Sequence, residues 1–299
     1  MTAAYYALTM GKYGPLLSLK RVLSAEDFKA SPLRAIVKRI VWHWRWRRRN
    51  DPWQIVLDNG MSILLPHTGP SALIFYQGSS DPHLAAYLES FLRPGMVFFD
   101  VGAHIGEFSL RATKCVGPTG QVHSFEPQPE IAAVFRQSIT LAKVRNLTLR
   151  ECVLSNKSES LTFSIRSGFA TSSIAHPASS DPTITRTIKV AATTLDEYTV
   201  TSGVSPHLIK IDVEGAEVMV LRGAESLLSL TAECAPVICL EYSSSNYAAF
   251  GFSTEEVCDL LIRNGYSLFA LDSQGTHPAT ESDLSNKEII NIVASKNKV

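Results

Sequence analysis

Met96-Val97-Phe98-Phe99-Asp100-Val101-Gly102-Ala103-His104-Ile105-Gly106 is the stretch that decides the fold of this chain. Its first half is a short apolar run typical of a buried strand, and the residues after Gly106 continue in a helical pattern. Gly102 and Gly106 allow a tight turn and a close approach of the backbone to a ligand. The unpaired N–H groups at the start of the new helix attract a negatively charged group. The stretch therefore predicts a strand, a glycine turn and a helix that together bind a cofactor.

A second acidic residue supports this interpretation. Glu126 ends the next apolar run, about 20 residues further on, where nucleotide-binding folds place the acid that binds a ribose. The glycines are spaced G-x-x-x-G, however, and the G-x-G-x-x-G series of a dinucleotide loop is absent. S-adenosylmethionine has no phosphate and presents an amino acid, a sulfonium and a ribose. We therefore favour S-adenosylmethionine over NAD as the cofactor of this loop.

Strands alternate with helices along most of the chain, which predicts an α/β fold with a mostly parallel sheet and helices on both faces. A hairpin at 53–57 and 61–65 begins this domain. We expect strands at 96–100, 121–125, 147–153, 207–212, 236–241, 268–271 and 289–293, and helices at 82–91, 105–115, 129–142, 215–230 and 253–263. Residues 157–194 break the alternation, and their pattern predicts a β-hairpin insertion with a mobile tip.

Composition is that of a globular protein. The chain has 299 residues, of which 45% are hydrophobic and 19% charged, and no apolar run is long enough to cross a membrane. Its five cysteines lack C-x-x-C spacing, so we expect reduced, buried thiols and no zinc site. Glycines and a proline interrupt the first 20 residues, so we expect no secretory signal and a cytoplasmic location.

The N-terminal region forms a separate electrostatic unit. Residues 1–50 hold 11 basic and 2 acidic residues, a balance of +9, and the remainder of the chain balances at −9. Within 34–49, apolar residues recur with helical spacing at Ile36, Val37, Ile40, Val41 and Trp44, among seven bases and no acid. We interpret 1–52 as a basic helical extension and 53–299 as the catalytic domain. The helix either touches an anionic membrane peripherally or packs on the domain, and we consider nucleic acid an unlikely partner.

Four motifs together resemble the FkbM family of S-adenosylmethionine-dependent methyltransferases. They are Asp100 to Gly106, Phe125-Glu126-Pro127, Thr194-Leu195-Asp196-Glu197-Tyr198 and Leu208-Ile209-Lys210-Ile211-Asp212-Val213-Glu214-Gly215-Ala216-Glu217. The resemblance extends over about residues 53–295. It implies a Rossmann-like class I methyltransferase fold, with a seven-stranded sheet whose last strand is antiparallel. It also implies methyl transfer to a hydroxyl of a sugar, glycolipid or polyketide-type product, so that the partner is a small-molecule or glycan acceptor.

The resemblance also implies which residues bind the cofactor. Those for the methionine end are Asp100 and the backbone of Gly102, Ala103, His104 and Gly106. Glu126, followed by Pro127, would accept hydrogen bonds from both ribose hydroxyls, and Ser155 would lie near the adenine. His104 departs from the family pattern, which frequently has asparagine there.

Catalysis needs a group that receives the proton of the acceptor hydroxyl. Asp212 and Glu214 should emerge at the carboxyl end of their strand, beside Glu241 on the next one, and open α/β sheets bind ligands at that edge. We rank them as base in that order. The same carboxylates could hold Mg²⁺, which we do not predict. We expect Lys210 to form an ion pair inside the sheet.

We expect neither Glu217 nor His207 to act as the base, and two rival functions of the protein remain open. We expect Glu217 in the first turn of a helix and His207 in a loop. An NAD-dependent oxidoreductase fits the strand, loop and helix but lacks the third glycine and a Tyr-x-x-x-Lys pair. A non-catalytic binding protein on the same fold is the other alternative. The oligomeric state is left open.

Overall fold

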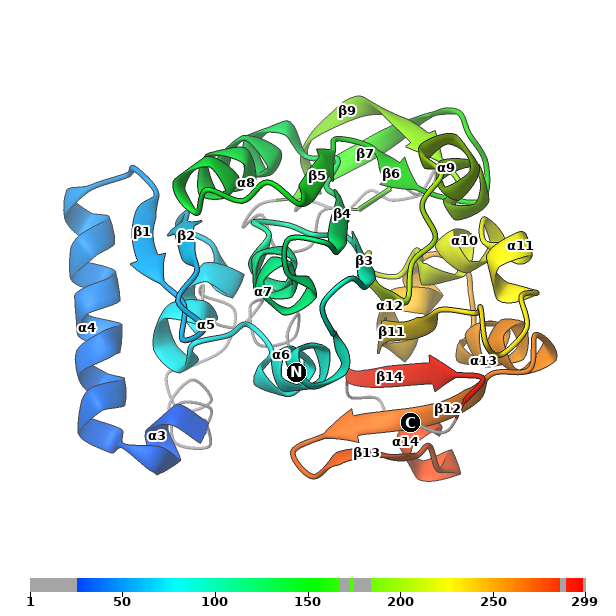
Figure 1. Cartoon of the computed structure of the whole chain (residues 1–299). Helices are drawn as coiled ribbons and strands as arrows, with labels where there is room; N and C mark the ends of the chain where they lie inside the picture. Colours follow the sequence, from blue (N-terminus) through cyan, green and yellow to red (C-terminus); the bar gives the residue numbers. More distant parts are fainter. Residues whose placement is uncertain (1–25, 167–172, 175–183, 286–288, 298–299) are drawn as a thin grey trace.

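A twisted eight-stranded sheet forms the centre of the computed structural model, which describes residues 26–166, 173–174, 184–285 and 289–297 (Figure 1). The strand order is β13-β12-β14-β11-β10-β3-β4-β5. Five neighbouring strands run parallel: β11 (Val237–Tyr242), β10 (Leu208–Ile211), β3 (Val97–Val101), β4 (Gln121–Phe125) and β5 (Leu147–Arg150). Their carboxyl ends therefore meet at one edge of the sheet.

The remaining strands of this sheet are antiparallel to their neighbours. β14 (Ile290–Ser295) lies between β11 and β12 (Ser267–Asp272) and runs opposite to both. The predicted Rossmann-like sheet with an antiparallel last strand is thus confirmed. The structure adds an eighth, edge strand, β13 (Gly275–Pro278), which pairs with β12. The four residues of β13 show no alternation of apolar and polar side chains, so we did not predict this strand.

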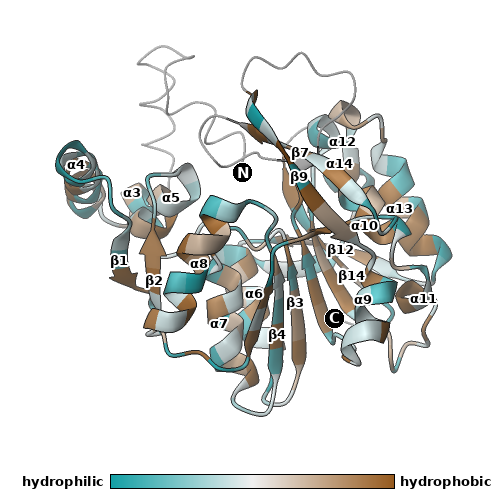
Figure 2. Ribbon diagram, turned by 90° about the horizontal axis from the view of Figure 1, so that it is seen from above, coloured by the Kyte–Doolittle hydropathy of each residue, from teal (hydrophilic) through white to brown (hydrophobic). Residues whose placement is uncertain are grey.

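Strand parity divides the core between the two faces of the sheet (Figure 2). On one face, Phe99 and Ile209 belong to a cluster with α9 (Leu195–Ser202), α10 (Glu217–Arg222), α11 (Glu225–Leu228) and α13 (Thr254–Arg263). On the other face, Phe98 and Leu208 pack with α6 (Pro82–Phe91) and α7 (Glu107–Val116). Because adjacent residues point to opposite faces, the continuous apolar strands of the sequence are buried on both sides.

A third cluster joins the N-terminal elements to the sheet. It contains residues of α4 (Pro32–Arg48), β2 (Ser62–Leu65), α5 (Gly69–Gln77) and α8 (Pro129–Leu141), together with Ala103 and Ile105. α3 (Glu26–Ala30) precedes α4, and β1 (Trp53–Val56) pairs with β2 as the predicted hairpin. The division of the chain at residue 52 stays a prediction.

The predicted elements differ from the structure in two places. The helix expected at 215–230 is broken into α10 and α11 at Gly223, where an added Cβ would lie 2.1 Å from the carbonyl oxygen of Ser155. The strand expected at 147–153 ends at Arg150, because β6 (Val153–Leu154) pairs with β9 (Ile184–Thr193) in a separate sheet.

That separate sheet contains the insertion. Its order is β6-β9-β7-β8, with β7 (Ser160–Arg166) antiparallel to both β9 and β8 (Ser173–Ile174). The mobile tip predicted for the hairpin falls mostly outside the described residues. Two further helices, α12 (Ser244–Ala249) and α14 (Glu281–Ser285), complete the structure. No helix in the described part of the chain has the length and apolarity needed to span a bilayer.

Candidate active site

The loop between β3 and α7 is held in a conformation that only its glycines allow. Gly102 has φ 79°, and a Cβ there would lie 1.9 Å from the backbone oxygen of Asp212. Gly106 has φ 82° and begins α7, and a Cβ there would lie 1.9 Å from the ring of Phe135. The N–H groups of Gly102 and Ala103 both donate to the carbonyl of Phe125, at 3.1 and 3.0 Å. The loop is therefore fixed against the end of β4.

Glu126 binds this loop from the end of β4. Its Oε2 accepts a hydrogen bond from the His104 N–H at 2.9 Å, and its Oε1 accepts one from the Gln128 N–H at 2.8 Å. The side chain is 7% exposed. Burial raises the pKa of Glu126 to about 7, although both backbone hydrogen bonds act in the opposite direction. Each carboxylate oxygen keeps a second lone pair, so Glu126 can still accept two hydrogen bonds from a ligand.

A buried chain of charges connects β3 with β10. Lys210 Nζ lies 3.2 Å from Asp100 Oδ1 and 3.3 Å from Asp212 Oδ2. Burial alone would lower the pKa of Lys210, but the carboxylates of Asp100 and Asp212 raise it above its ordinary value. Asp100 is fully buried, and its Oδ2 accepts a hydrogen bond from Ser109 Oγ at 2.5 Å. The structure thus gives the Asp100 side chain internal partners, and its contact with a cofactor stays a prediction.

The three predicted catalytic carboxylates lie close together. One oxygen from each of Asp212, Glu214 and Glu241 can be chosen so that all three lie within 4.8 Å of one another. Asp212 follows β10 with its side chain 35% exposed, whereas Glu241 in β11 is only 8% exposed. The register pairs Lys210 with Cys239, so residues 212 and 241 fall at the same edge of the sheet. Such a group can accept a proton or bind a cation.

Glu214 reaches the cluster through an unusual backbone conformation. It has φ 57°, and the next residue, Gly215, has φ 104°. Glu214 Oε2 accepts a hydrogen bond from Asn246 Nδ2 at 3.3 Å. The sequence reasoning missed Asn246, because the capping residue Ser243 marks only the start of α12 and says nothing about what the helix contacts.

The other predicted residues occupy different surroundings. Ser155 is buried, with its N–H donating to the Thr193 carbonyl and its Oγ to Asn156 Oδ1, so its hydrogen bonds within the described part of the chain go to residues outside the glycine loop. Pro127 is half-buried beside Glu126. Glu217 is fully buried in the first turn of α10 and accepts a hydrogen bond from the Val213 N–H at 2.9 Å. Burial raises the pKa of Glu217 to about 8.

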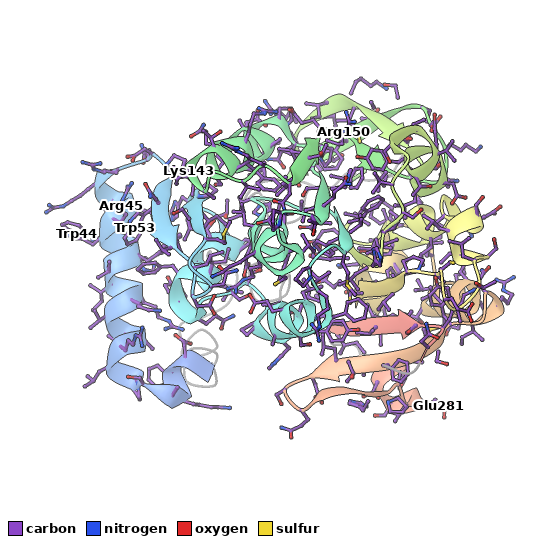
Figure 3. The ribbon with its side chains drawn as sticks, viewed as in Figure 1. Trp44, Arg45, Trp53, Lys143, Arg150 and Glu281 are labelled. Atoms are coloured by element: carbon purple, nitrogen blue, oxygen red, sulfur yellow. The ribbon has the colours of Figure 1, made fainter. Side chains whose placement is uncertain are left out.

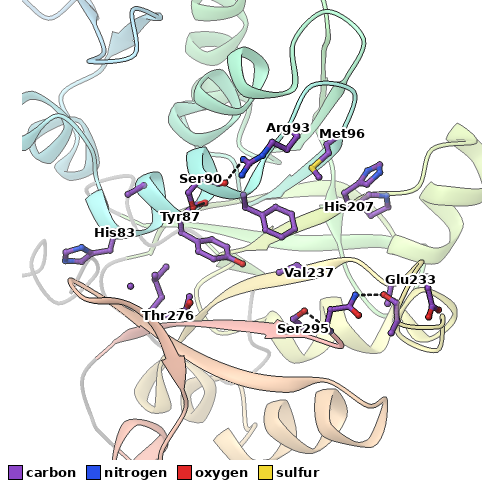
Figure 4. A pocket seen from close by; sticks show the side chains of 18 of the residues that line it. His83, Tyr87, Ser90, Arg93, Met96, His207, Glu233, Val237, Thr276 and Ser295 are labelled. Carbon is purple, nitrogen blue, oxygen red and sulfur yellow. Dashed lines mark hydrogen bonds between the residues drawn. The ribbon is translucent and has the colours of Figure 1, made fainter. Parts of the chain in front are cut away.

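His207 lies at the opposite edge of the sheet from the carboxylates. It precedes β10, and its Nδ1 accepts a hydrogen bond from the Val97 N–H at 3.0 Å. It also lines a cavity of about 1260 Å³ at the amino ends of the parallel strands, together with His83, Arg93 and Glu233 (Figure 4). A much smaller cavity, of about 30 Å³, touches Asp212 and Glu241. The small cavity lies at the carboxyl ends of the parallel strands, the edge at which the glycine loop and the acids converge and at which open α/β sheets bind ligands.

The comparisons with known proteins agree with this geometry. Residues 100–268 match the Methyltransferase FkbM domain. The chain is similar to 31-O-demethyl-FK506 methyltransferase FkbM of Streptomyces tacrolimicus, at 26% identity over 197 residues, which cover 56% of this chain and 74% of that protein. It is also similar to protein-L-isoaspartate O-methyltransferase of Methanothrix thermoacetophila, at 33% identity over 75 residues, which cover 24% of this chain and only 36% of that protein.

Two solved structures align with part of this chain. Precorrin-6y C5,15-methyltransferase of Geobacter metallireducens aligns with a TM-score of 0.42 and 16% identity, covering 72% of this chain and 88% of that one. A SAM dependent methyltransferase of Agrobacterium tumefaciens aligns with a TM-score of 0.44 and 11% identity, covering 83% of this chain and 71% of that one. Since the family match alone spans more than half of the sequence, the protein belongs to the FkbM methyltransferase family.

Proposed function

We propose that the protein is an S-adenosylmethionine-dependent O-methyltransferase that modifies a hydroxyl of a sugar, glycolipid or polyketide-type product. The observation that carries this proposal is Glu126, a buried acid that fixes the glycine loop and still has lone pairs for a ligand. The names of both sequence relatives describe methyl transfer involving an oxygen. These names support O-methylation, and the acceptor itself is part of the proposal.

The residues around the loop fit S-adenosylmethionine. Its ribose hydroxyls would donate to Glu126, which the His104 N–H ties to the glycine loop. The cofactor supplies a methyl carbon on a cationic sulfur. The acids Asp212, Glu214 and Glu241 lie at the same sheet edge, where their negative charge would stabilise that cation. NAD would instead place a pyrophosphate near these carboxylates, which would repel it.

Asp212 is the base in this proposal. Lys210 Nζ lies 3.3 Å from Asp212 Oδ2 and fixes the position of this carboxylate. Asp212 is also more exposed than Asp100, the other carboxylate paired with Lys210. The acceptor hydroxyl would donate its proton to Asp212 while its oxygen replaces the sulfur on the methyl carbon, so that the carbon–sulfur bond breaks and a neutral thioether leaves. Glu214 and Glu241 would orient the acceptor from either side. Placing the oxygen in line with the reacting carbon supplies much of the rate.

The same three carboxylates suit a divalent cation, which is the second way they could act. Mg²⁺ prefers oxygen ligands at about 2.1 Å, so two ligand oxygens on one ion lie at most about 4.2 Å apart. The observed limit of 4.8 Å requires only a small movement of the side chains. Mg²⁺ would lower the pKa of the acceptor hydroxyl. Loss of methyl transfer in EDTA that added Mg²⁺ restores would assign this role, and undiminished activity in EDTA would leave Asp212 as the base.

The direct test uses the full chain with isotopically labelled cofactor and a panel of glycans and polyketides, followed by mass spectrometry. We expect a labelled methyl group on an oxygen of one acceptor and none with Asp212→Asn. A thermal shift with S-adenosylmethionine but not with NAD excludes the oxidoreductase. Cofactor binding without transfer to any hydroxyl would favour the non-catalytic binding protein instead.

A further inference from the structure

Helix α4 carries apolar side chains on two opposite faces, of which only one is packed. Trp42 and Trp46 are 3% and 9% exposed and belong to the cluster that contains Ala103 and Ile105. Trp42 also stacks on Trp53 of β1, with ring centroids 6.3 Å apart. These contacts anchor the helix to the domain and fix which side faces outward.

The outward face is the apolar stripe that the sequence pattern indicated. Its large side chains recur at i, i+3, i+4, i+7, i+8 and i+11, the spacing of one helical face. All are exposed: Leu33, Ile36, Val37, Ile40, Val41 and Trp44, with Leu33 at 80%, Ile40 at 61% and Trp44 at 54%. Figure 3 shows Trp44 on the side of α4 away from the molecule and Trp53 on the inner side. A contiguous exposed apolar patch of this kind marks an interaction surface.

Positive charge borders the stripe. The helix contains six Lys and Arg residues and no Asp or Glu. The bases nearest the body have internal partners: Lys38 donates to the Tyr76 carbonyl at 2.9 Å, and Arg39 and Arg45 form ion pairs. Arg34, Arg47 and Arg48 lie on the exposed side, and none makes an ion pair with any other part of the chain that the structure describes. The free charges thus point the same way as the apolar side chains.

We propose that the outward face of α4 binds the surface of an anionic membrane, with the helix lying parallel to the bilayer. Charge complementarity selects this partner, because the free charges beside the stripe are those of arginines and the helix offers no acid to a basic protein surface. The guanidinium of Arg48 stacks on Trp44 at 4.4 Å, an arrangement that places both at the level of lipid headgroups. In Figure 1 the helix stands at one end of the molecule, so a flat surface can reach it.

Docking would hold the catalytic domain at the membrane. Trp42 and Trp46 share a packed cluster with Ala103 and Ile105 of the glycine loop. The docked helix is therefore rigidly connected to the candidate active site. This inference does not depend on methyl transfer, and its test measures binding alone.

The test is flotation of the full chain with phosphatidylcholine vesicles that contain about one third phosphatidylglycerol, at low and high salt. We expect wild-type protein to float with these vesicles and at least about tenfold less with pure phosphatidylcholine. Ile40→Asp with Trp44→Asp should abolish flotation, and Arg47→Glu with Arg48→Glu should reduce it at least about tenfold at low salt. Ile262→Asp is the matched control, since Ile262 is 55% exposed on α13.

Melting temperatures close to the wild-type value would show that the variants fold, as expected for exposed positions. Failure of the wild-type protein to float with anionic vesicles at low salt would overturn the proposal. So would flotation of Ile40→Asp with Trp44→Asp at the wild-type level. Light scattering that reveals a dimer lost in the same variant, with no vesicle binding, would instead assign the face to a second copy.

Discussion

Replacing Glu126 by glutamine tests the cofactor site through one atom. The substitution keeps the shape of the side chain but leaves a single acceptor oxygen where the wild-type residue has two. The His104 and Gln128 N–H groups both require acceptors, so glutamine must lose at least one hydrogen bond of the loop or of the ribose. A hydrogen bond to a charged group contributes about 1.5–3 kcal/mol. We therefore expect Glu126→Gln to weaken S-adenosylmethionine binding by about 10-fold to 150-fold at pH 8.

The pH dependence gives a second readout of the same residue. Since burial raises the pKa of Glu126 to about 7, the residue is mostly protonated at pH 6 and ionised at pH 8. If the ribose binds the ionised form, affinity should rise about tenfold between these pH values in the wild-type protein and stay level in Glu126→Gln. The effect on folding has the opposite sign. A carboxyl whose pKa is higher in the folded state stabilises the fold at low pH and loses that contribution as the pH rises through about 7.

Isothermal titration calorimetry measures both effects. Glu130→Gln serves as the control, because Glu130 lies four positions further on in an exposed ion pair with Arg186. The melting temperature of each protein without ligand separates loss of the fold from loss of the ribose contact. Unchanged affinity in a folded Glu126→Gln protein would refute the ribose assignment, and so would an identical pH slope in both proteins.

Three further substitutions probe the loop, the charge chain and the base. Gly106→Ala should destabilise the protein by about 2 kcal/mol or more in urea unfolding, because its Cβ would overlap the buried ring of Phe135. Gly78→Ala is the control: Gly78 has φ 93° and no neighbour within 4 Å, so this variant should lose less stability. Equal losses of stability in the two variants would contradict the packing argument. Lys210→Met should destabilise by about 3–5 kcal/mol by leaving Asp100 buried without its cation, and a loss below about 1 kcal/mol in the same assay would contradict the buried pair. Asp212→Asn should lower kcat by about 10²-fold to 10⁴-fold with cofactor affinity unchanged, whereas retained kcat would move the base to another carboxylate.

The sequence could predict the cofactor loop because its determinants are local. Glycine permits a positive φ, which Gly102 and Gly106 both have in the structure. An acid at the carboxyl end of a parallel strand must emerge at the ligand-binding edge of the sheet. The gathering of Asp212, Glu214 and Glu241 follows from strand parity and from parallel pairing of the two strands. The arrangement of the sheet with an antiparallel last strand was implied by the resemblance to the FkbM family.

The features that sequence could not predict depend on contacts between distant residues. The expected long helix is interrupted at Gly223, where the Ser155 carbonyl approaches and the Asp196 N–H donates to the Gly223 carbonyl, both from other elements. Periodicity finds the apolar stripe from Ile36 to Trp44 on α4, but it cannot decide that the opposite side with Trp42 and Trp46 packs on the domain and that the stripe stays exposed. The contact of Asp100 with the cofactor stays a prediction, and the sequence did not indicate the hydrogen bond that Ser109 donates to it inside the sheet. Each outcome is set by tertiary packing.

A crystal structure of the protein soaked with S-adenosylhomocysteine would test most directly whether the acidic edge of the sheet binds the cofactor. We predict both ribose hydroxyls within hydrogen-bonding distance of Glu126 and the amino-acid end beside the loop from Gly102 to Gly106. Density for the nucleoside in the cavity lined by His83 and His207, with no ligand touching Glu126, would contradict the account.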